Sequence, residues 1–239
     1  MGDVSRQPAD RPGAELPHTG EELTRIYDER FSPAEIEVKE KLWAVLCESF
    51  FSRLVEPTDT VLDLAAGRCE FLNAIRAGHK IAVDLNPEVE RHARGATVVV
   101  APSTDMAPVA TGSVDVVFTS NFFEHLPSKR ALLDTLTECR RVLRAGGRLI
   151  VLMPNIRYCA ARYWDYLDHH LPLSHLSLVE ALEISGFGIE RVVPRFLPYT
   201  VKGSRLPPAP WLVRLYLRMP VVWPIVGKQM LVVGRAPAG

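Results

Sequence analysis

The chain has 239 residues, with 28 Lys and Arg against 28 Asp and Glu and a hydrophobic fraction of 47%. This length allows one ordinary α/β domain with additions, and the hydrophobic fraction excludes a disordered or fibrous chain. The four cysteines include no Cys-x-x-Cys pair, so we expect a reduced, cytoplasmic protein. No run of about 18 apolar residues is present, so we expect no membrane-spanning helix.

The neutral total conceals an asymmetry along the chain. Glu190 is the last acidic residue, and eight Lys or Arg residues follow it. The last 49 residues therefore carry a net charge of +8, and the first 190 carry −8. A basic end of this kind is either a solvated face or a site for an anionic partner or membrane surface, and both interpretations stay open.

Residues 1–20 are rich in Pro, Gly and charge and lack periodicity, so we expect a flexible tail there. Residues 21–56 carry apolar side chains at helical spacing and predict one or two helices at the start of a single domain that spans 21–239. Short apolar runs then alternate with helical patterns. The runs predict strands at 60–64, 80–84, 97–101, 113–119, 148–153, 189–196 and 229–234.

The helix after the fourth strand has the clearest ends. Ser128 can cap its start, and Gly146-Gly147 predicts its end. Two shorter helices are predicted, one between the first two strands and one at 177–185. Strands that alternate with helices indicate a parallel sheet covered on both faces.

Carboxylates stand where ligands bind in open α/β sheets, beyond the carboxyl ends of the strands. Asp63 lies near the end of the first strand, and Asp84 ends the second. The first turn has only Gly67 where a pyrophosphate loop needs several glycines, and Glu70 adds a third carboxylate. Because these carboxylates would repel a phosphate, the loop favours a ligand with an ammonium and a sulfonium group.

Four stretches follow one another at the spacing of a known family. They are Val61-Leu-Asp-Leu-Ala-Ala-Gly67, Val83-Asp-Leu-Asn-Pro87, Gly112-Ser-Val-Asp-Val-Val-Phe-Thr-Ser-Asn-Phe-Phe-Glu-His-Leu126 and Val142-Leu-Arg-Ala-Gly-Gly-Arg-Leu-Ile-Val151. Together they resemble class I S-adenosylmethionine-dependent methyltransferases of the type 11 group, over about residues 40–235. The resemblance implies a Rossmann-like, doubly wound α/β fold with a seven-stranded sheet, helices on both faces and strand seven antiparallel. The chain departs from the family where Ala65 and Cys69 replace the first and third glycines of the first motif.

The resemblance implies S-adenosylmethionine as the cofactor and suggests residues that bind it. Asp63, Ala65 and Gly67 would line the methionine end, Asp84 would hold the ribose hydroxyls, and Leu85 would pack on the adenine. Two further groups would read the adenine edge and face the sulfonium: Ser103, Thr104 and Asp105 for the first, and Ser120 and Asn121 for the second. The alternatives are a helix cap at Asp63 and a turn residue at Asn121.

The segment after the fourth strand narrows the class of acceptor. Ser120-Asn-Phe-Phe-Glu-His125 lacks the Pro-Pro pair found in enzymes that methylate base amines, so we expect no nucleic-acid partner. We expect O-methylation of a small-molecule or glycan hydroxyl, with C-methylation or other N-methylation as the alternatives. Transfer to a hydroxyl needs orientation and a base.

Histidine can accept a proton near neutral pH, and three candidates for the catalytic base follow the strands. His169 and His170 come after the fifth strand, in a cluster with Asp165 and His175. This fold usually builds its acceptor pocket there, so we prefer the pair to His125. His125 would lie closer to the sulfonium, and its loss is expected to perturb folding or cofactor affinity. We expect no metal site, because adjacent histidines point differently.

Two segments are candidates for contacts with the acceptor. Aromatic and basic side chains beside the histidines are predicted to bind the acceptor or to form a lid: Arg157, Tyr158, Arg162, Tyr163 and Trp164. The other segment is an apolar, basic insertion at 201–227, too short and too broken by proline to cross a membrane. Its residues 207–226 either contact the inner face of a membrane or pack within the domain or a homodimer. The membrane alternative would suit an anionic or lipid-linked acceptor.

Two other functions are compatible with the sequence. An NAD(P)-dependent reductase or epimerase would use a similar sheet, but the glycines are missing and no Tyr-x-x-x-Lys pair is present. The other is a non-catalytic protein that binds S-adenosylmethionine or docks on a membrane, because Ala65 and Cys69 interrupt the first motif.

Overall fold

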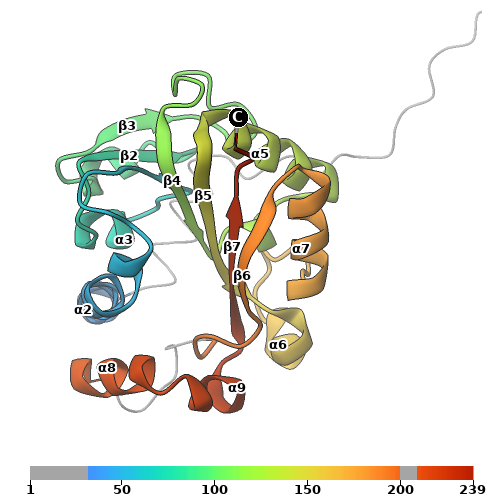
Figure 1. Ribbon diagram of the computed structural model, residues 1–239. Coiled ribbons are helices and arrows are strands. Elements are labelled where there is room, and N and C mark those ends of the chain that lie inside the picture. Colours follow the sequence, from blue (N-terminus) through green and yellow to red (C-terminus); the bar gives the residue numbers. More distant parts are fainter. Residues whose placement is uncertain (1–31, 200–208, 239) are drawn as a thin grey trace, which may run out of the picture.

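A computed structural model of the chain describes residues 32–199 and 209–238. The predicted tail at 1–20 and residues 201–208 of the insertion lie outside the described residues. The strands of the described part form one seven-stranded sheet in the order β3-β2-β1-β4-β5-β7-β6 (Figure 1). Their bounds are β1 Thr60–Leu64, β2 His79–Asp84, β3 Thr97–Val100, β4 Val114–Ser120, β5 Leu143–Pro154, β6 Gly188–Val193 and β7 Gln229–Arg235. Strands β1 to β5 pair in parallel, whereas β7 runs antiparallel to β5 and β6, which confirms the expected topology.

Helices cover both faces of this sheet (Figure 1). The longer ones are α2 Pro33–Ser49, α5 Lys129–Val142, α6 Ile156–Tyr163, α7 His175–Ile184 and α8 Pro210–Arg218. The short ones are η1 Phe51–Arg53, α3 Glu70–Ala74, α4 Val89–His92, η2 Phe123–His125, η3 Pro220–Val222 and α9 Trp223–Val226. Residues of α2, α3 and α8 share one core cluster, and those of α5 and α7 share the other. No helix of the described segments has the length and apolar character needed to cross a membrane.

The two core clusters follow from the alternation of side chains along each strand. In β4, Val117 belongs to the cluster under α5 and α7, while its neighbours Val116 and Phe118 belong to the cluster under α2 and α3. In β5, Leu149 and Ile150 divide in the same way. Both faces of the central strands are therefore buried, and their carboxyl ends are held at one edge of a fixed sheet.

Aromatic packing attaches α2 to the sheet. The rings of Phe71 and Phe118 stack with centroids 3.6 Å apart, and Trp43 of α2 meets both rings edge-on. The helix itself begins at a capping box, in which the Ser32 hydroxyl accepts from the Glu35 amide and the Glu35 carboxylate accepts from the Ser32 amide. This is one of the helices predicted within 21–56.

The glycine pair after α5 does not end a helix, so that boundary was wrong. Ser128 caps α5 as predicted, but the helix ends at Val142 and β5 already begins at Leu143. Gly146 and Gly147 lie inside β5, next to a register shift in its pairing with β4. A Cβ at Gly147 would lie 3.0 Å from two carbonyl oxygens, so glycine here permits a close backbone approach.

Candidate functional site

The loop after β1 keeps a glycine-like backbone where the side chains are not glycine. Ala65, Gly67 and Cys69 have φ angles of 58°, 52° and 56°. These are the three motif positions at which the sequence has a single glycine. A left-handed conformation costs an L-residue about 1–2 kcal/mol. All three positions therefore have a backbone conformation that glycine adopts readily, and Ala65 and Cys69 adopt it at a cost.

The carboxylate that ends β2 is fastened to this loop. The amide of Gly67 donates to Oδ2 of Asp84 at 2.7 Å, and the amide of Asn86 donates to Oδ1 at 2.8 Å. Burial raises the pKa of Asp84, although these amide hydrogen bonds oppose the shift. Each carboxylate oxygen has two lone pairs, so both oxygens can still accept a hydroxyl. Leu85 follows with 39% of its surface exposed and offers an apolar wall.

Negative charge is concentrated around the loop. Asp63 of β1 is buried, and its burial together with the charges of Glu70 and Asp84 raises its pKa well above the ordinary value. Lys39 of α2 lies 3.2 Å from Glu70 and offsets part of this charge. A cationic ligand would lower the energy of all three carboxylates, whereas a phosphate would raise it. These three carboxylates fit S-adenosylmethionine, which carries an ammonium and a sulfonium and no phosphate.

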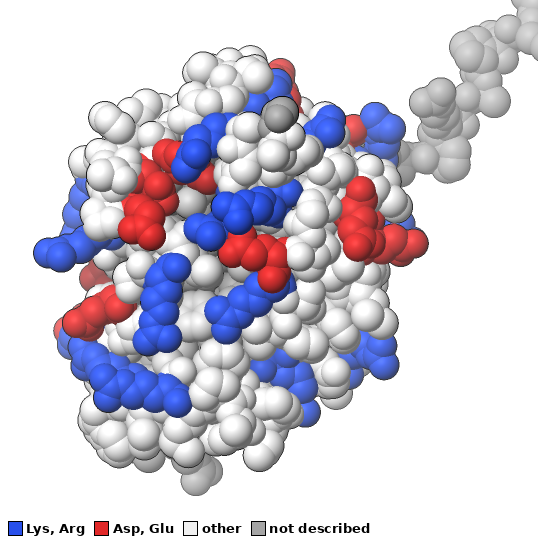
Figure 2. Space-filling model, in the orientation of Figure 1, with Lys and Arg blue, Asp and Glu red and all other residues white. Residues whose placement is uncertain are grey.

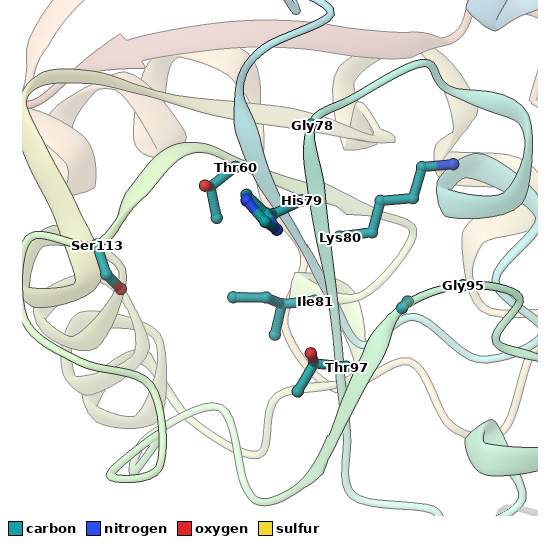
Figure 3. Close-up of a pocket in the computed structure, with 9 residues that line it drawn as sticks. Thr60, Gly78, His79, Lys80, Ile81, Gly95, Thr97 and Ser113 are labelled. Atoms are coloured by element: carbon teal, nitrogen blue, oxygen red, sulfur yellow. The ribbon is translucent and has the colours of Figure 1, made fainter.

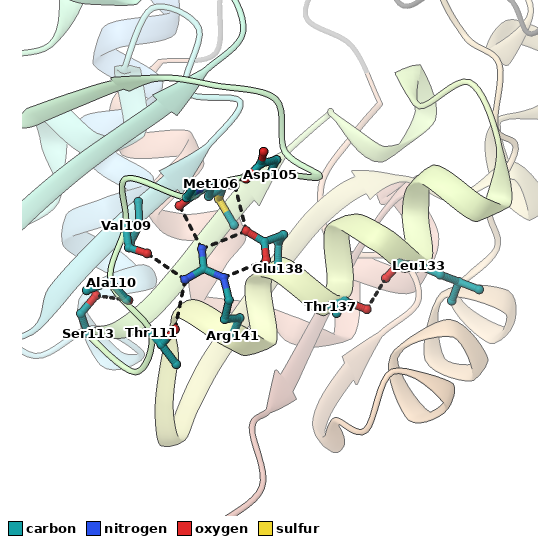
Figure 4. A network of polar contacts seen from close by, with 11 residues as sticks. Asp105, Met106, Val109, Ala110, Thr111, Ser113, Leu133, Thr137, Glu138 and Arg141 are labelled. Carbon is teal, nitrogen blue, oxygen red and sulfur yellow. Dashed lines mark hydrogen bonds and ion pairs between the residues drawn. The ribbon is translucent and has the colours of Figure 1, made fainter.

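The loop after β3 is held in place by α5 (Figure 4). Glu138 accepts from the Met106 amide at 2.8 Å, and Arg141 donates to the carbonyl oxygens of Met106 and Val109. Ser103 shares a 2.8 Å hydrogen bond with Thr135 of α5. The residues expected to read the adenine edge are therefore divided. The Ser103 hydroxyl faces α5, and Thr104 and Asp105 are exposed, with Asp105 accepting from the Ala107 amide.

The end of β4 carries another left-handed residue. Asn121 has a φ of 49°, its amide donates to Leu152 of β5 at 2.8 Å, and its side chain donates to the Ser120 hydroxyl at 3.0 Å. The strained residues thus follow β1 and β4, which are neighbours in the sheet. The contact of Ser120 and Asn121 with the sulfonium stays a prediction, and the turn alternative for Asn121 describes its backbone.

Two distant segments meet just beyond Asn121. Nδ1 of His125 lies 2.8 Å from the carbonyl oxygen of Asp168 and 3.3 Å from its carboxylate. The rings of His125 and His169 meet edge-on with centroids 5.0 Å apart. The carbonyl oxygen of Glu124 accepts from the amides of His170 and Leu171. The backbone therefore ties the segment after α6 to η2 and brings two of the three predicted base candidates together.

The cluster contains two carboxylates that the sequence analysis did not assign. Glu124 is 1% exposed, burial raises its pKa to about 8, and one of its oxygens has no hydrogen-bond partner among the described residues. Asp168 is buried beside it, so Asp168 rather than Asp165 supplies the carboxylate next to the histidines. Each stands directly before a candidate histidine, which is the signal that could have found them. The ring of His170 is not part of the group formed by Glu124, His125 and His169, whose nitrogen and oxygen atoms lie within 4.8 Å of one another and could ligate a cation.

The residues in and just after α6 that were predicted to contact the acceptor differ in burial. Tyr163 is fully buried, and its hydroxyl donates to the Leu171 carbonyl at 2.7 Å, which favours its role in packing a lid. Tyr158 stacks on His175, whose Nδ1 contacts Asn155 at 3.0 Å, so His175 lies apart from the base cluster. The exposed members are Arg157, Arg162 and Trp164.

A groove on the opposite edge of the sheet is a different feature (Figure 3). It is lined by the first residues of three strands, Thr60, His79 and Thr97, together with Ile81 and Ser113. Ligands of open α/β sheets bind beyond the carboxyl ends. This groove lies at the amino ends and holds none of the predicted site residues.

Comparisons with known proteins agree with the fold. Residues 62–151 match a family model described as "Methyltransferase domain". No curated protein matches the chain. A chain from the complex between the Trm112 methyltransferase activator of Haloferax volcanii and a methyltransferase is similar at 20% identity and a TM-score of 0.64, covering 91% of this chain and 96% of that one.

Two further solved structures share the fold. A SAM-dependent methyltransferase from Archaeoglobus fulgidus has 18% identity and a TM-score of 0.62, covering 89% of this chain and 98% of that one. A geranyl diphosphate C-methyltransferase from Streptomyces coelicolor, in complex with Mg²⁺, geranyl diphosphate and S-adenosyl-L-homocysteine, has 17% identity and a TM-score of 0.55, covering 76% and 72%. The resemblance to class I methyltransferases is thereby confirmed.

Proposed function

We propose that the chain transfers a methyl group from S-adenosylmethionine to a hydroxyl group of a small molecule or glycan. The match of residues 62–151 to a methyltransferase domain supports the methyl transfer. The observation that carries the choice of a hydroxyl is the cluster of Glu124, His125, Asp168 and His169. A hydroxyl must lose its proton during transfer, and this cluster lies directly after β4, at the carboxyl edge that also carries Asp63 and Asp84.

The cofactor supplies a methyl group on a positively charged sulfonium, and the chain orients it. Asp84 would accept the two ribose hydroxyls with its free lone pairs, while Gly67 and Asn86 hold its carboxylate in place. Asp63 and Glu70 would attract the cationic end. Leu85 would pack on the adenine, and Asn121 would face the sulfonium.

The histidines would take the proton. Nδ1 of His125 contacts the carbonyl oxygen of Asp168, and in that tautomer the ring would accept the proton on Nε2. The Asp168 carboxylate lies close enough to stabilise the imidazolium that forms. This offsets the repulsion from the nearby sulfonium that disfavours His125 on sequence grounds. His169 is the second base candidate within the cluster, and His170 is the third, outside it.

The acceptor would enter under α6. Arg157, Arg162 and Trp164 are exposed there and suit an anionic or lipid-linked acceptor. Tyr163 fixes the helix above the cluster and helps to exclude water. An acceptor linked to a lipid would be met at the inner face of the membrane.

Labelled product can be used to test the reaction type. The purified chain is incubated with S-adenosyl-[methyl-³H]methionine and a panel of sugars, polyprenyl-linked glycans and small alcohols, each beside its deoxy analogue. We expect label in the hydroxyl compounds, as an ether that survives mild alkali, and none in the deoxy analogues. Equal labelling of a compound and its deoxy analogue would indicate methylation of carbon or nitrogen and would reject the proposal.

A further inference from the structure

The segment between β6 and β7 exposes a continuous apolar surface. In its described part, α8, η3 and α9 present large apolar side chains to solvent, and Trp211, Val221 and Ile225 are 66%, 77% and 74% exposed. We call this the α8–α9 surface, and its members are Trp211, Leu212, Leu215, Met219, Val221, Ile225 and Val226. Contiguous apolar surface of this kind marks an interaction site.

The exposure is imposed by packing on the opposite side of the same elements. Val213, Leu217 and Trp223 are buried in the core cluster that also contains α2. The indole nitrogen of Trp223 donates to the Tyr216 carbonyl at 2.9 Å, and the Tyr216 hydroxyl donates to the Phe196 carbonyl. The segment therefore cannot turn its apolar face inward without losing its anchor.

The surface is bordered by positive charge. Arg218 is exposed at the end of α8, and Lys228 is exposed just after α9. Arg214 is different, because it is paired with Glu48 of α2 at 2.8 Å. No acidic residue follows Glu190 in the sequence. Figure 2 shows the result: the lower end of the molecule, over α8 and α9, is white, and Lys and Arg side chains border it.

A direct contact joins the surface to the acceptor side of the site. Arg195 donates to the carbonyl oxygens of Ile225 and Gly227, both at 2.7 Å, and its guanidinium lies 4.9 Å from the ring centre of Tyr158 in α6. Helices α6, α8 and α9 also lie at the same end of the molecule (Figure 1). An acceptor taken from a layer beneath the α8–α9 surface would thus reach α6 directly.

We propose that the α8–α9 surface docks on a membrane rich in acidic phospholipids. A Trp- and Leu-bearing helix that lies in the interface plane needs an apolar face and cations beside it, and α8 provides both. Acidic headgroups complement Arg218 and Lys228. The inference deepens the proposed function by naming the surface from which a lipid-linked acceptor is reached, and it rests on that function only for the acceptor.

Vesicle flotation of the full chain tests the docking. The vesicles contain phosphatidylcholine alone or with 30% phosphatidylglycerol. We expect flotation with the acidic vesicles only, and a loss of at least tenfold in bound protein for Ile225→Asp. The matched control is Ile184→Asp, because Ile184 on α7 is 69% exposed but lies outside the surface. Equal flotation of both variants, or none by the unaltered chain, would overturn the proposal.

Further measurements test the role of charge in docking and the oligomeric state of the chain. Arg218→Glu should reduce flotation severalfold, and so should 0.5 M NaCl, because exposed charges are screened. Sedimentation should show a monomer whose mass Ile225→Asp leaves unchanged, whereas a dimer abolished by Ile225→Asp would assign the surface to a second copy. Calorimetry with S-adenosylhomocysteine separates the two claims: its binding should be equal in Ile225→Asp and the unaltered chain. Flotation without such binding would reject the proposed function and keep the surface.

Discussion

The amide of Gly67 donates a 2.7 Å hydrogen bond to Oδ2 of Asp84 and so joins the loop after β1 to the end of β2. The bond orients the carboxylate that we propose accepts both ribose hydroxyls, while Ala65 and Cys69 of the same loop have a left-handed backbone. On this proposal, cofactor binding depends on a backbone conformation as much as on side chains.

Removal of the Asp84 carboxylate should weaken the cofactor site selectively. We expect Asp84→Ala to reduce the affinity for S-adenosylhomocysteine by about 2–3 kcal/mol, the range for hydrogen bonds to a charged group. Calorimetry measures this loss. Asp134→Ala is the control, because Asp134 pairs with Arg130 on the surface of α5. Native affinity in Asp84→Ala would show that the ribose is held elsewhere.

The strain in the loop can be measured with two adjacent alanines. Ala65→Gly removes a Cβ from a residue with a φ of 58°, which relieves about 1–2 kcal/mol and is partly offset by about 0.5–1 kcal/mol of unfolded-chain entropy. Ala66→Gly relieves no strain, because Ala66 is not left-handed, and it has the entropic cost together with the loss of a buried methyl group. Urea unfolding should therefore show Ala65→Gly to be at least as stable as the unaltered chain, and Ala66→Gly less stable. Equal destabilisation by both would mean that the loop is not strained.

The sequence predicts the sheet well because the strands are buried on both faces and read as short apolar runs. It also predicts the positions of Asp63 and Asp84 at the ends of β1 and β2, because a carboxylate that follows a short apolar run is visible in the sequence. It fails at Gly146-Gly147, where the pairing of Leu143 with Val114 in the adjacent strand overrides a local helix-stop signal. Tertiary contacts decide that boundary.

The base cluster shows the other limit of sequence reasoning. His125 and Asp168 are 43 residues apart, and no local pattern predicts that their backbone and side chains meet. Glu124 looks like part of a motif, yet only the structure shows that it is buried beside two histidines. The hydroxyl of the buried Tyr163 donates to the Leu171 carbonyl, so Tyr163 is a packing residue. The aromatic and basic composition of its segment also suggests a contact with the acceptor.

Histidine variants should separate the base from its neighbours. We expect His125→Ala and His169→Ala each to lower kcat by about 10²–10⁴-fold, as loss of a general base does. The adjacent His170→Ala is the matched comparison and should retain most activity, because the His170 ring lies outside the group formed by Glu124, His125 and His169. Turnover is measured with the acceptor found in the labelling screen, and S-adenosylhomocysteine affinity should change less than twofold. A large loss in His170→Ala with full activity in His125→Ala would restore the preference for the His169-His170 pair over His125.

Glu124 should make stability depend on pH. Its pKa is raised from about 4.5 in the unfolded chain to about 8 by burial. Between these two pH values the folded state therefore binds one more proton than the unfolded chain. The contribution of Glu124 to the free energy of unfolding is fully present below about pH 4.5. It falls by up to about 1.4 kcal/mol per pH unit as the pH rises toward about 8. Urea unfolding from pH 5 to 8 should show this decline, and Glu124→Gln should flatten it. The exposed Glu180→Gln should leave the slope unchanged, and an unchanged slope in Glu124→Gln would contradict the assignment.

The carboxylate-rich loop after β1 should select a cationic, phosphate-free cofactor. Thermal unfolding of the unaltered chain with S-adenosylhomocysteine, S-adenosylmethionine, NAD and NADP tests it most directly. We expect a rise in Tm with both S-adenosyl compounds and no rise with either dinucleotide. A larger rise with NAD or NADP than with S-adenosylhomocysteine would contradict it.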